Sequence, residues 1–207
     1  NMGLTLFEKG EFDSAADHFK KAIKFGPSAV HYNNRGLANF HAQNIKDALE
    51  DFDRALELNS NSDPTIYFNR GNALLSQNQY ERALMDYEEA ITIQPNNPKY
   101  FHAKGIAYEA MAGEIETKHG KKRKFYKSSR DEEQADSLKV YLRFDYLELV
   151  EESIKSYLQA IDVDENFLQS RFHLGKMLAA TYQYQEALHH YNRVIESLKP
   201  SENDPEE

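Results

Sequence analysis

Apolar residues recur along this chain at intervals of three and four, in pairs of short stretches separated by polar turns. That interval places apolar side chains on one face of an α-helix and excludes the alternation of a half-buried strand. Asp63 followed by Pro64 is an N-cap followed by a first helical residue, and Pro95 ends a helix. The pattern predicts helices at residues 1–9, 12–25, 29–41, 45–58, 64–77, 80–93, 98–111, 146–164, 165–181 and 184–198.

Each helix pair carries small and aromatic residues in a fixed order. In residues 67–95 the order is Gly71, Ala83, Tyr87 and Ala90. Small residues let two helix backbones approach closely, and the aromatic side chain fills the space beside them. The other copies are Gly3/Ala15/Phe19/Ala22, Gly36/Ala48/Phe52/Ala55, Gly105/Ser153/Tyr157/Ala160 and Gly175/Ala187/Tyr191/Val194.

This order, repeated with a period of roughly 34 residues, resembles the tetratricopeptide repeat (TPR). The resemblance implies an all-α, right-handed superhelical array of about five helix hairpins, each in contact with its neighbours. We expect the array to fill residues 1–199 and residues 200–207 to be a disordered acidic tail. The expected repeats are 1–27, 28–62, 63–97, 98–112 joined to 146–164, and 165–199.

An insertion at residues 113–145 interrupts the fourth repeat. Residues 117–130 are basic and have no apolar period, so we expect them to be mobile. Residues 131–150 have apolar positions at helical spacing, which predicts a helix that either extends the second helix of the repeat or precedes it as a separate element.

Composition narrows the class of function. The net charge of −9 makes nucleic acid an unlikely partner, and the absence of cysteine excludes disulfides and thiolate chemistry. No segment approaches the ~18 apolar residues of a membrane-spanning helix. Without a phosphate-binding loop, a metal-ligand pattern or an ordered nucleophile, we expect no enzyme activity, cofactor, metal or small-molecule substrate. The absence of cysteine favours an intracellular, cytoplasmic protein, with nuclear or ciliary sites as alternatives. The chain starts at Asn1 inside an expected helix, so we expect it to be a piece of a longer protein.

The resemblance further implies a concave groove, lined by the first helix of each hairpin, that binds a protein or peptide. Asn34 and Asn69 share one repeat position and would form a ladder of amides for an extended peptide, or else satisfy local backbone. The aromatic residues among the groove positions could equally pack between repeats. The groove positions are Asn33, Asn34, Leu37, Phe40, His41, Phe68, Asn69, Asn72, Lys99, His102, Phe172, His173 and Lys176.

Three other modes of interaction stay open. Some TPR proteins grip the C-terminal carboxylate of Hsp70 and Hsp90 chaperones, but Leu4, Thr65 and Asn69 stand where charged or polar clamp residues are required. Exposed terminal repeats could form a homodimer or a self-associating array. The insertion could be a solvated loop, a nuclear-import patch, a site for acidic partners, or an internal lid. Its candidate residues are Lys121, Lys122, Arg123, Lys124, Tyr141 and Phe144.

Overall fold

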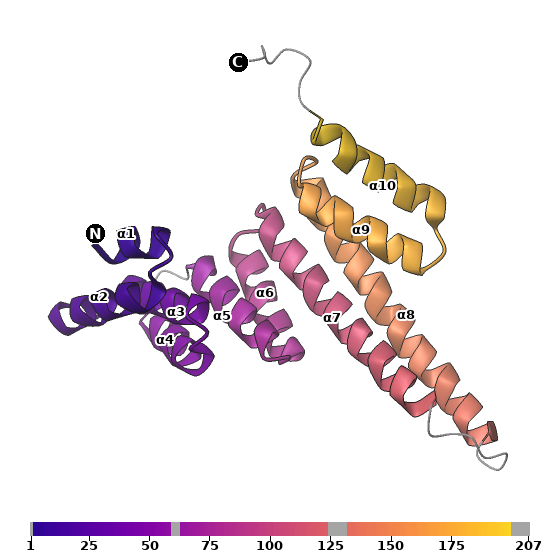
Figure 1. The fold of residues 1–207 in the computed structure, drawn as a ribbon, viewed down its shortest axis with the longest axis horizontal. Coiled ribbons are helices and arrows are strands. Elements are labelled where there is room, and N and C mark those ends of the chain that lie inside the picture. Colours follow the sequence, from indigo (N-terminus) through magenta and orange to yellow (C-terminus); the bar gives the residue numbers. More distant parts are fainter. Residues whose placement is uncertain (1, 59–62, 124–131, 200–207) are drawn as a thin grey trace. The chain divides into compact units, whose positions relative to one another are not determined.

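The computed structural model describes the backbone of residues 2–58, 63–123 and 132–199, and the side chains of residues 2–58, 63–117 and 145–199. These residues form helices and no strands (Figure 1). The expected all-α class is therefore confirmed. The helices are α1 (Met2–Glu8), α2 (Phe12–Phe25), α3 (Ala29–His41), α4 (Ile45–Glu57), α5 (Pro64–Ser76), α6 (Tyr80–Ile93), α7 (Pro98–Arg123), α8 (Glu132–Val163), α9 (Leu168–Ala180) and α10 (Tyr184–Ser197).

The chain divides into two compact units, an N-terminal unit of residues 1–96 and a C-terminal unit of residues 97–207. The first contains the hairpins α1–α2, α3–α4 and α5–α6, and the second contains α7–α8 and α9–α10. We call the first helix of each hairpin its A helix and the second its B helix. Within a unit, each A helix packs on the B helix of the preceding hairpin: α3 on α2, α5 on α4, and α9 on α8.

The helix ends follow local chemistry. The Asp63 carboxylate accepts a hydrogen bond from the Thr65 amide at 2.9 Å, with Pro64 at the first helical position, so the predicted start of α5 is confirmed. The turn inside four of the hairpins contains one left-handed residue. These residues are Gly10 (φ 78°), Gln43 (φ 65°), Asn78 (φ 57°) and Tyr182 (φ 65°).

The small and aromatic residues of the repeat pattern form the contact between the two helices of each hairpin. A Cβ atom at Gly71 would lie 2.6 Å from Cε1 of Tyr87, and one at Gly36 would lie 2.8 Å from Cε1 of Phe52. Tyr87 and Phe52 are fully buried. Glycine is therefore required where the aromatic ring lies against the facing helix backbone, as the sequence pattern predicted.

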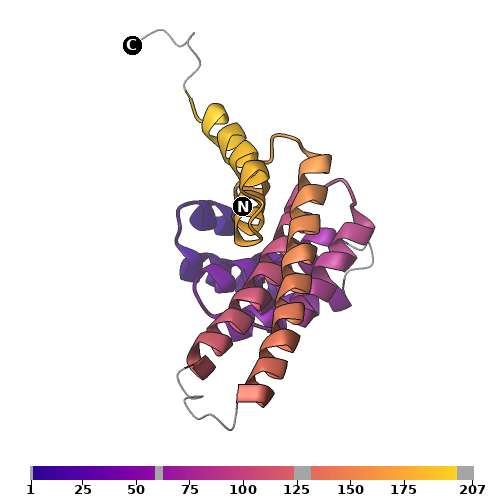
Figure 2. The ribbon, with the colours of Figure 1, turned by 90° about the vertical axis from the view of Figure 1, so that its right-hand side faces the viewer.

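The fourth hairpin differs from its expected form. We predicted a first helix over residues 98–111, but α7 continues to Arg123, so the expectation of a mobile segment is wrong for residues 117–123. Residues 132–163 form one helix, which confirms that the apolar segment extends the second helix of the repeat. The two long helices lie side by side (Figure 2).

The contact between α7 and α8 explains the added length of α7. Ala112 is buried beside Val150 in the core of the C-terminal unit, and Tyr146 and Leu149 pack against the same core. A helix that touches only one neighbour needs few apolar positions, so the apolar content of residues 112–123 was too low to register as a helical period.

Candidate partner-binding surface

In the N-terminal unit, the structure joins two of the predicted asparagines across successive A helices. Asn69 on α5 donates its side-chain N–H to the side-chain oxygen of Asn33 on α3 at 3.0 Å. Both side chains are half-buried. The repeat pattern placed Asn69 at the same repeat position as Asn34. The hydrogen bond across the two helices is instead made by Asn33, the residue of α3 that contacts Asn69 of α5. Asn34 is half-buried and has no hydrogen-bond partner among the described side chains.

The neighbouring predicted groove residues Phe68 and Asn72 are half-buried and contact Tyr87. The Tyr87 hydroxyl donates to the side-chain oxygen of Asn72 at 2.9 Å, and the ring of Phe68 lies 6.1 Å from that of Tyr87. These contacts hold the side chains of Asn72 and Phe68, both on α5, against Tyr87 of α6. Leu37 on α3 is also half-buried.

Two predicted groove residues at the end of α3 contact other side chains of the N-terminal unit, Phe40 half-buried and His41 exposed. Phe40 packs against the buried cluster that contains Phe52 and Ala73. His41 stacks on Phe12 with 5.0 Å between ring centroids. The alternative role that the sequence left open for aromatic residues, packing between repeats, therefore applies to Phe40.

Two ion pairs, which the sequence analysis did not predict, stabilise the second and third hairpins. Arg70 on α5 donates to both carboxylate oxygens of Asp86 on α6, at 2.9 and 2.7 Å, and to Asp53 on α4 at 2.7 Å. These hydrogen bonds raise the pKa of Arg70. Arg35 pairs with the buried Asp51 in the same way. The signal was present as an arginine before each glycine and an aspartate before each aromatic residue of these repeats.

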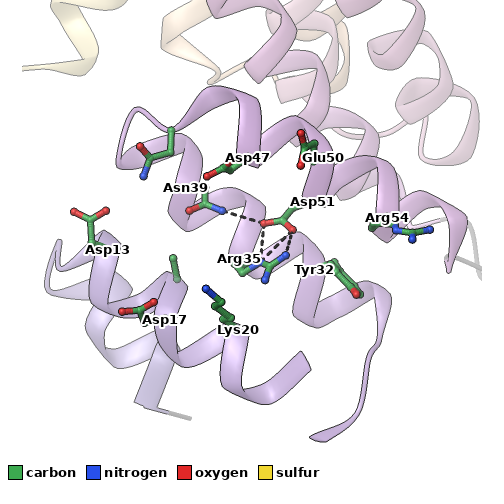
Figure 3. A pocket seen from close by; sticks show the side chains of 12 residues that line it. Asp13, Asp17, Lys20, Tyr32, Arg35, Asn39, Asp47, Glu50, Asp51 and Arg54 are labelled. Carbon is green, nitrogen blue, oxygen red and sulfur yellow. Dashed lines mark hydrogen bonds and ion pairs between the residues drawn. The ribbon is translucent and has the colours of Figure 1, made fainter. Parts of the chain in front are cut away.

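Arg35 and Asp51 also line a cavity of about 590 Å³ between α2, α3 and α4. Asn39 donates a hydrogen bond to Asp51 at 3.0 Å. Figure 3 shows this bond, with Asp17 and Lys20 of α2 across the cavity. The lining is mostly charged. None of the predicted groove residues lines this cavity.

In the C-terminal unit, the predicted positions converge on one carboxylate. Glu109 on α7 accepts hydrogen bonds from Lys176 at 2.6 Å, from His173 Nδ1 at 2.9 Å and from the Tyr157 hydroxyl at 2.7 Å. Burial by itself raises the pKa of Glu109, but the bonds from His173, Lys176 and Tyr157 outweigh it and lower that pKa to about 2. Glu109 is ionised near neutral pH, so His173 Nδ1 carries the proton of its bond.

His102 lies beside this cluster. Its Nδ1 is hydrogen-bonded to the Ser170 hydroxyl at 3.0 Å, and its ring contacts those of Tyr157 and His173. Burial and the neighbouring His173 lower the pKa of His102 to about 4. The exposed groove residues on this side are Lys99, Phe172 and Lys176. His173 is half-buried, and both His173 and Lys176 are hydrogen-bonded to Glu109 within the fold.

The insertion candidates are only partly described. Lys121, Lys122 and Arg123 form the end of α7, and Tyr141 and Phe144 lie in α8. Their side chains, and Lys124 altogether, lie outside the described residues. The same holds for the expected tail at 200–207.

Comparison with known proteins agrees with the hairpin geometry. The family model described as "Tetratricopeptide repeat" matches residues 29–62 and 64–97, which contain α3–α4 and α5–α6. The arrangement of hairpins around glycine–aromatic contacts defines a helical repeat protein. Residues 29–62 and 64–97 of the chain are therefore tetratricopeptide repeats.

Curated relatives match over part of their length. A DnaJ homolog subfamily C member 7 homolog of Schizosaccharomyces pombe is 27% identical over 125 residues, covering 53% of this chain and 26% of that protein. Serine/threonine-protein phosphatase 5 of Rattus norvegicus is 30% identical over 92 residues, covering 44% of this chain and 18% of that protein. The chain spans about a quarter or less of the length of the first relatives it matches.

A solved structure extends the likeness to nearly the whole chain. MamA from Desulfovibrio magneticus RS-1 shares the fold with a TM-score of 0.70 at 20% identity, covering 97% of this chain and 94% of that one. Within the described part of the present chain, no helix is both long enough and apolar enough to cross a membrane, and no three His, Cys, Asp or Glu side chains group as metal ligands.

Proposed function

We propose that this chain is a non-catalytic scaffold that binds a segment of a partner protein on the face shared by α3 and α5. That face consists of Asn33, Asn34, Leu37, Phe68, Asn69 and Asn72. The partner would be an extended or helical segment that offers backbone amides together with apolar side chains.

One observation carries this proposal: the side-chain amide of Asn34 is half-buried, has no hydrogen-bond partner among the described side chains, and lies next to the hydrogen-bonded pair Asn33–Asn69. The pair uses one donor and one acceptor, so each asparagine still has hydrogen-bonding capacity for a ligand. Leu37 and Phe68 supply apolar surface beside these amides. Polar groups fixed by packing next to apolar side chains are what a peptide-binding surface requires.

The experiment starts with peptides selected from a random-sequence display library on the intact chain. Asn34→Ala should weaken the binding of selected peptides by about 2- to 12-fold, which corresponds to one hydrogen bond worth about 0.5–1.5 kcal/mol. Fluorescence anisotropy with labelled peptide measures the loss. Because Asn34 has no hydrogen-bond partner among the described side chains, the substitution should not lower the free energy of unfolding.

Glu50→Ala is the matched control, because Glu50 is exposed in the cavity between α2 and α4. Peptides on the α3–α5 face should bind this variant as they bind the unsubstituted chain. Selected peptides that lose affinity on Glu50→Ala and keep it on Asn34→Ala would refute the proposal. The cavity would then be the binding site.

The same scaffold role specifies the class of partner and the cellular setting that we propose. The partner is a protein or peptide rather than a nucleic acid or a small molecule, and the setting is intracellular. A grip on a chaperone C-terminal carboxylate remains the weaker alternative, because Thr65 and Asn69 provide no positive charge on α5 for that carboxylate.

A further inference from the structure

A second cavity, of about 490 Å³, lies between α8, α9 and α10 in the C-terminal unit. Like the cavity between α2, α3 and α4, it lies between two B helices and the A helix that packs on both of them. Its volume falls within the ~300–1,000 Å³ that is usual for ligand sites in proteins. Its apolar lining residues are Ile154, Leu158, Leu174 and Leu178, and its acidic lining residues are Glu151, Asp162 and Glu186.

The two cavities differ at the positions of the ion pair. In the N-terminal unit, Arg35 precedes the glycine of its repeat and pairs with Asp51, which precedes the aromatic residue. Leu174 and His190 occupy these two positions in the last repeat. Leu178 stands where the N-terminal cavity has the asparagine that donates to Asp51. Leucines therefore form the floor of the C-terminal cavity in place of a hydrogen-bonded ion pair.

His190 has lost the partners that the equivalent aspartate keeps. Its Nδ1 atom is buried and has no hydrogen-bond partner among the described residues. Native proteins leave few buried polar atoms unpaired, and a bound ligand is one explanation for those that remain. Burial and the nearby Arg171 and His189 lower the pKa of His190, so its imidazole is uncharged near neutral pH. The cavity therefore carries no positive charge from His190.

Acidic side chains surround the apolar floor. Glu151, Asp162 and Glu186 are exposed, and none of them has an ion-pair partner among the described side chains. Lys155, which also lines the cavity, is paired with Glu152 at 3.4 Å. Leu158 is 42% exposed beside these carboxylates. The complement of this surface is an apolar side chain next to a positive charge.

We propose that this cavity binds a cationic, amphipathic segment of a partner protein. An aliphatic side chain of the segment packs against Leu158 and Ile154, over the floor formed by Leu174 and Leu178. A neighbouring lysine or arginine of the segment pairs with the carboxylate of Glu186. The apolar contact supplies affinity, and the charges select the partner and its orientation. This surface is separate from the α3–α5 face and does not depend on it.

The first test examines the charge of the ligand. The probe is a labelled helical peptide of about 15 residues, built from leucine and lysine with leucine at intervals of three and four. Fluorescence anisotropy on the full chain should show binding of this peptide and none of a matched leucine–glutamate peptide. A chain that fails to bind the leucine–lysine peptide would overturn the proposal.

The acidic rim has a matched control in the other unit. Glu186→Gln should weaken binding of the leucine–lysine peptide by about two- to fivefold, as expected for loss of an exposed ion pair. Asp47→Asn removes a carboxylate at the equivalent position of the N-terminal cavity and should leave the affinity unchanged. Equal losses from the two variants would mean that the peptide is attracted by the net charge of the chain and that the proposed site is wrong.

The apolar contact is tested without changing the charge. Leu158→Gln should weaken the same peptide by at least about threefold, because an exposed leucine no longer contributes apolar area to the contact. Leu188→Gln is the control, because Leu188 is 54% exposed on α10 and does not line the cavity. Both leucines are exposed, so both variants should fold. Equal affinities for the two variants would contradict the proposed contact.

A final variant restores the ion pair of the other repeats. Leu174→Arg combined with His190→Asp adds one positive and one negative charge, so the net charge of the chain is unchanged. Arg35 is 24% exposed, so an arginine at the equivalent position should reach into the cavity and weaken the peptide by at least about tenfold. Circular dichroism checks the fold, and a folded double variant with full affinity would refute the proposal. If the double variant does not fold, the Leu158→Gln and Glu186→Gln comparisons decide.

Discussion

At the residue scale, the glycines facing aromatic rings set the distance between the two helices of a hairpin. Gly71→Ala should lower the free energy of unfolding by about 1–3 kcal/mol, because the new Cβ would lie 2.6 Å from Cε1 of the buried Tyr87. This cost exceeds the ~1 kcal/mol by which alanine favours a helix over glycine. Chemical denaturation measures the difference.

Gly113 provides the matched comparison. It lies in α7, is exposed, and has nothing within 4 Å of an added Cβ. Gly113→Ala should therefore stabilise the chain by up to about 1 kcal/mol. If both substitutions stabilise, the close packing of Gly71 on Tyr87 is not what selects glycine there.

The residues themselves show how far sequence alone could reach. Gly36 and Gly71 were identified because one missing side chain, paired with an aromatic at fixed spacing, leaves a periodic trace. The Asn33–Asn69 hydrogen bond left no periodic trace in the sequence, because it depends on which residue of α3 contacts α5. The hydrogen bonds of Glu109 left none either, because they come from Tyr157 on α8 and His173 on α9, each separated from Glu109 by more than 45 residues in the chain.

At the element scale, Arg70 joins α5 to both α4 and α6. Asp86→Ala should destabilise the N-terminal unit by about 2–3 kcal/mol, below the usual 3–5 kcal/mol for breaking a buried pair, because Arg70 is 22% exposed and keeps Asp53 as a partner. Thermal or urea unfolding followed by circular dichroism measures the change.

Asp53→Ala removes the other partner of the same arginine. Asp53 is 52% exposed, so this loss should cost less than about 1 kcal/mol. Equal losses from the two variants would show that burial of Asp86 does not determine the strength of the pair.

The helix boundaries were predicted closely in the short hairpins. Helices α3 and α6 begin and end at the expected residues. Helix α7 runs past its expected end, and its added residues include few apolar positions, of which Ala112 is buried in the core beside Val150 of α8.

At the scale of the whole molecule, the two units differ in their response to acid. The pKa of His102 is lowered from its ordinary value of 6.5 to about 4, so between these values the unfolded chain binds a proton that the folded chain does not. The stability of the C-terminal unit should therefore fall as the pH drops from 6.5 to 4. His102 contributes at most about 1.4 kcal/mol per pH unit to this slope, the limit for one proton.

Glu109 extends this loss to lower pH. Its pKa falls from 4.5 to about 2 on folding, so its contribution is present above pH 4.5 and is lost as the pH approaches 2. Hydrogen exchange, corrected for intrinsic rates, resolves the two units. His102→Asn should flatten the slope above pH 4.5 in the C-terminal unit, and an unchanged slope would exclude His102 as its source.

The repeat fold could be predicted as a whole because every hairpin has the same pattern of small and aromatic residues. A mistaken helix boundary in one hairpin therefore does not change the prediction for the others. Residue roles on its surfaces were less so, because they depend on how one hairpin meets the next and on which side chains already have partners. Asn34 and Lys176 illustrate this point, since both were predicted to line the groove. The Lys176 side chain is hydrogen-bonded to Glu109, whereas Asn34 has no hydrogen-bond partner among the described side chains.

The long fourth hairpin changes how this array can evolve. A repeat protein normally gains surface by adding a further unit at one end, which alters the neighbours of an existing unit. Here α7 and α8 extend past α9 and α10 (Figures 1 and 2): α7 has 26 residues against 13 in α9, and α8 has 32 against 14 in α10, which adds roughly three and a half and five turns. Equal insertions or deletions in both arms would change the reach of this spur while every inter-repeat contact stayed as it is, so spur length can vary among relatives independently of the core.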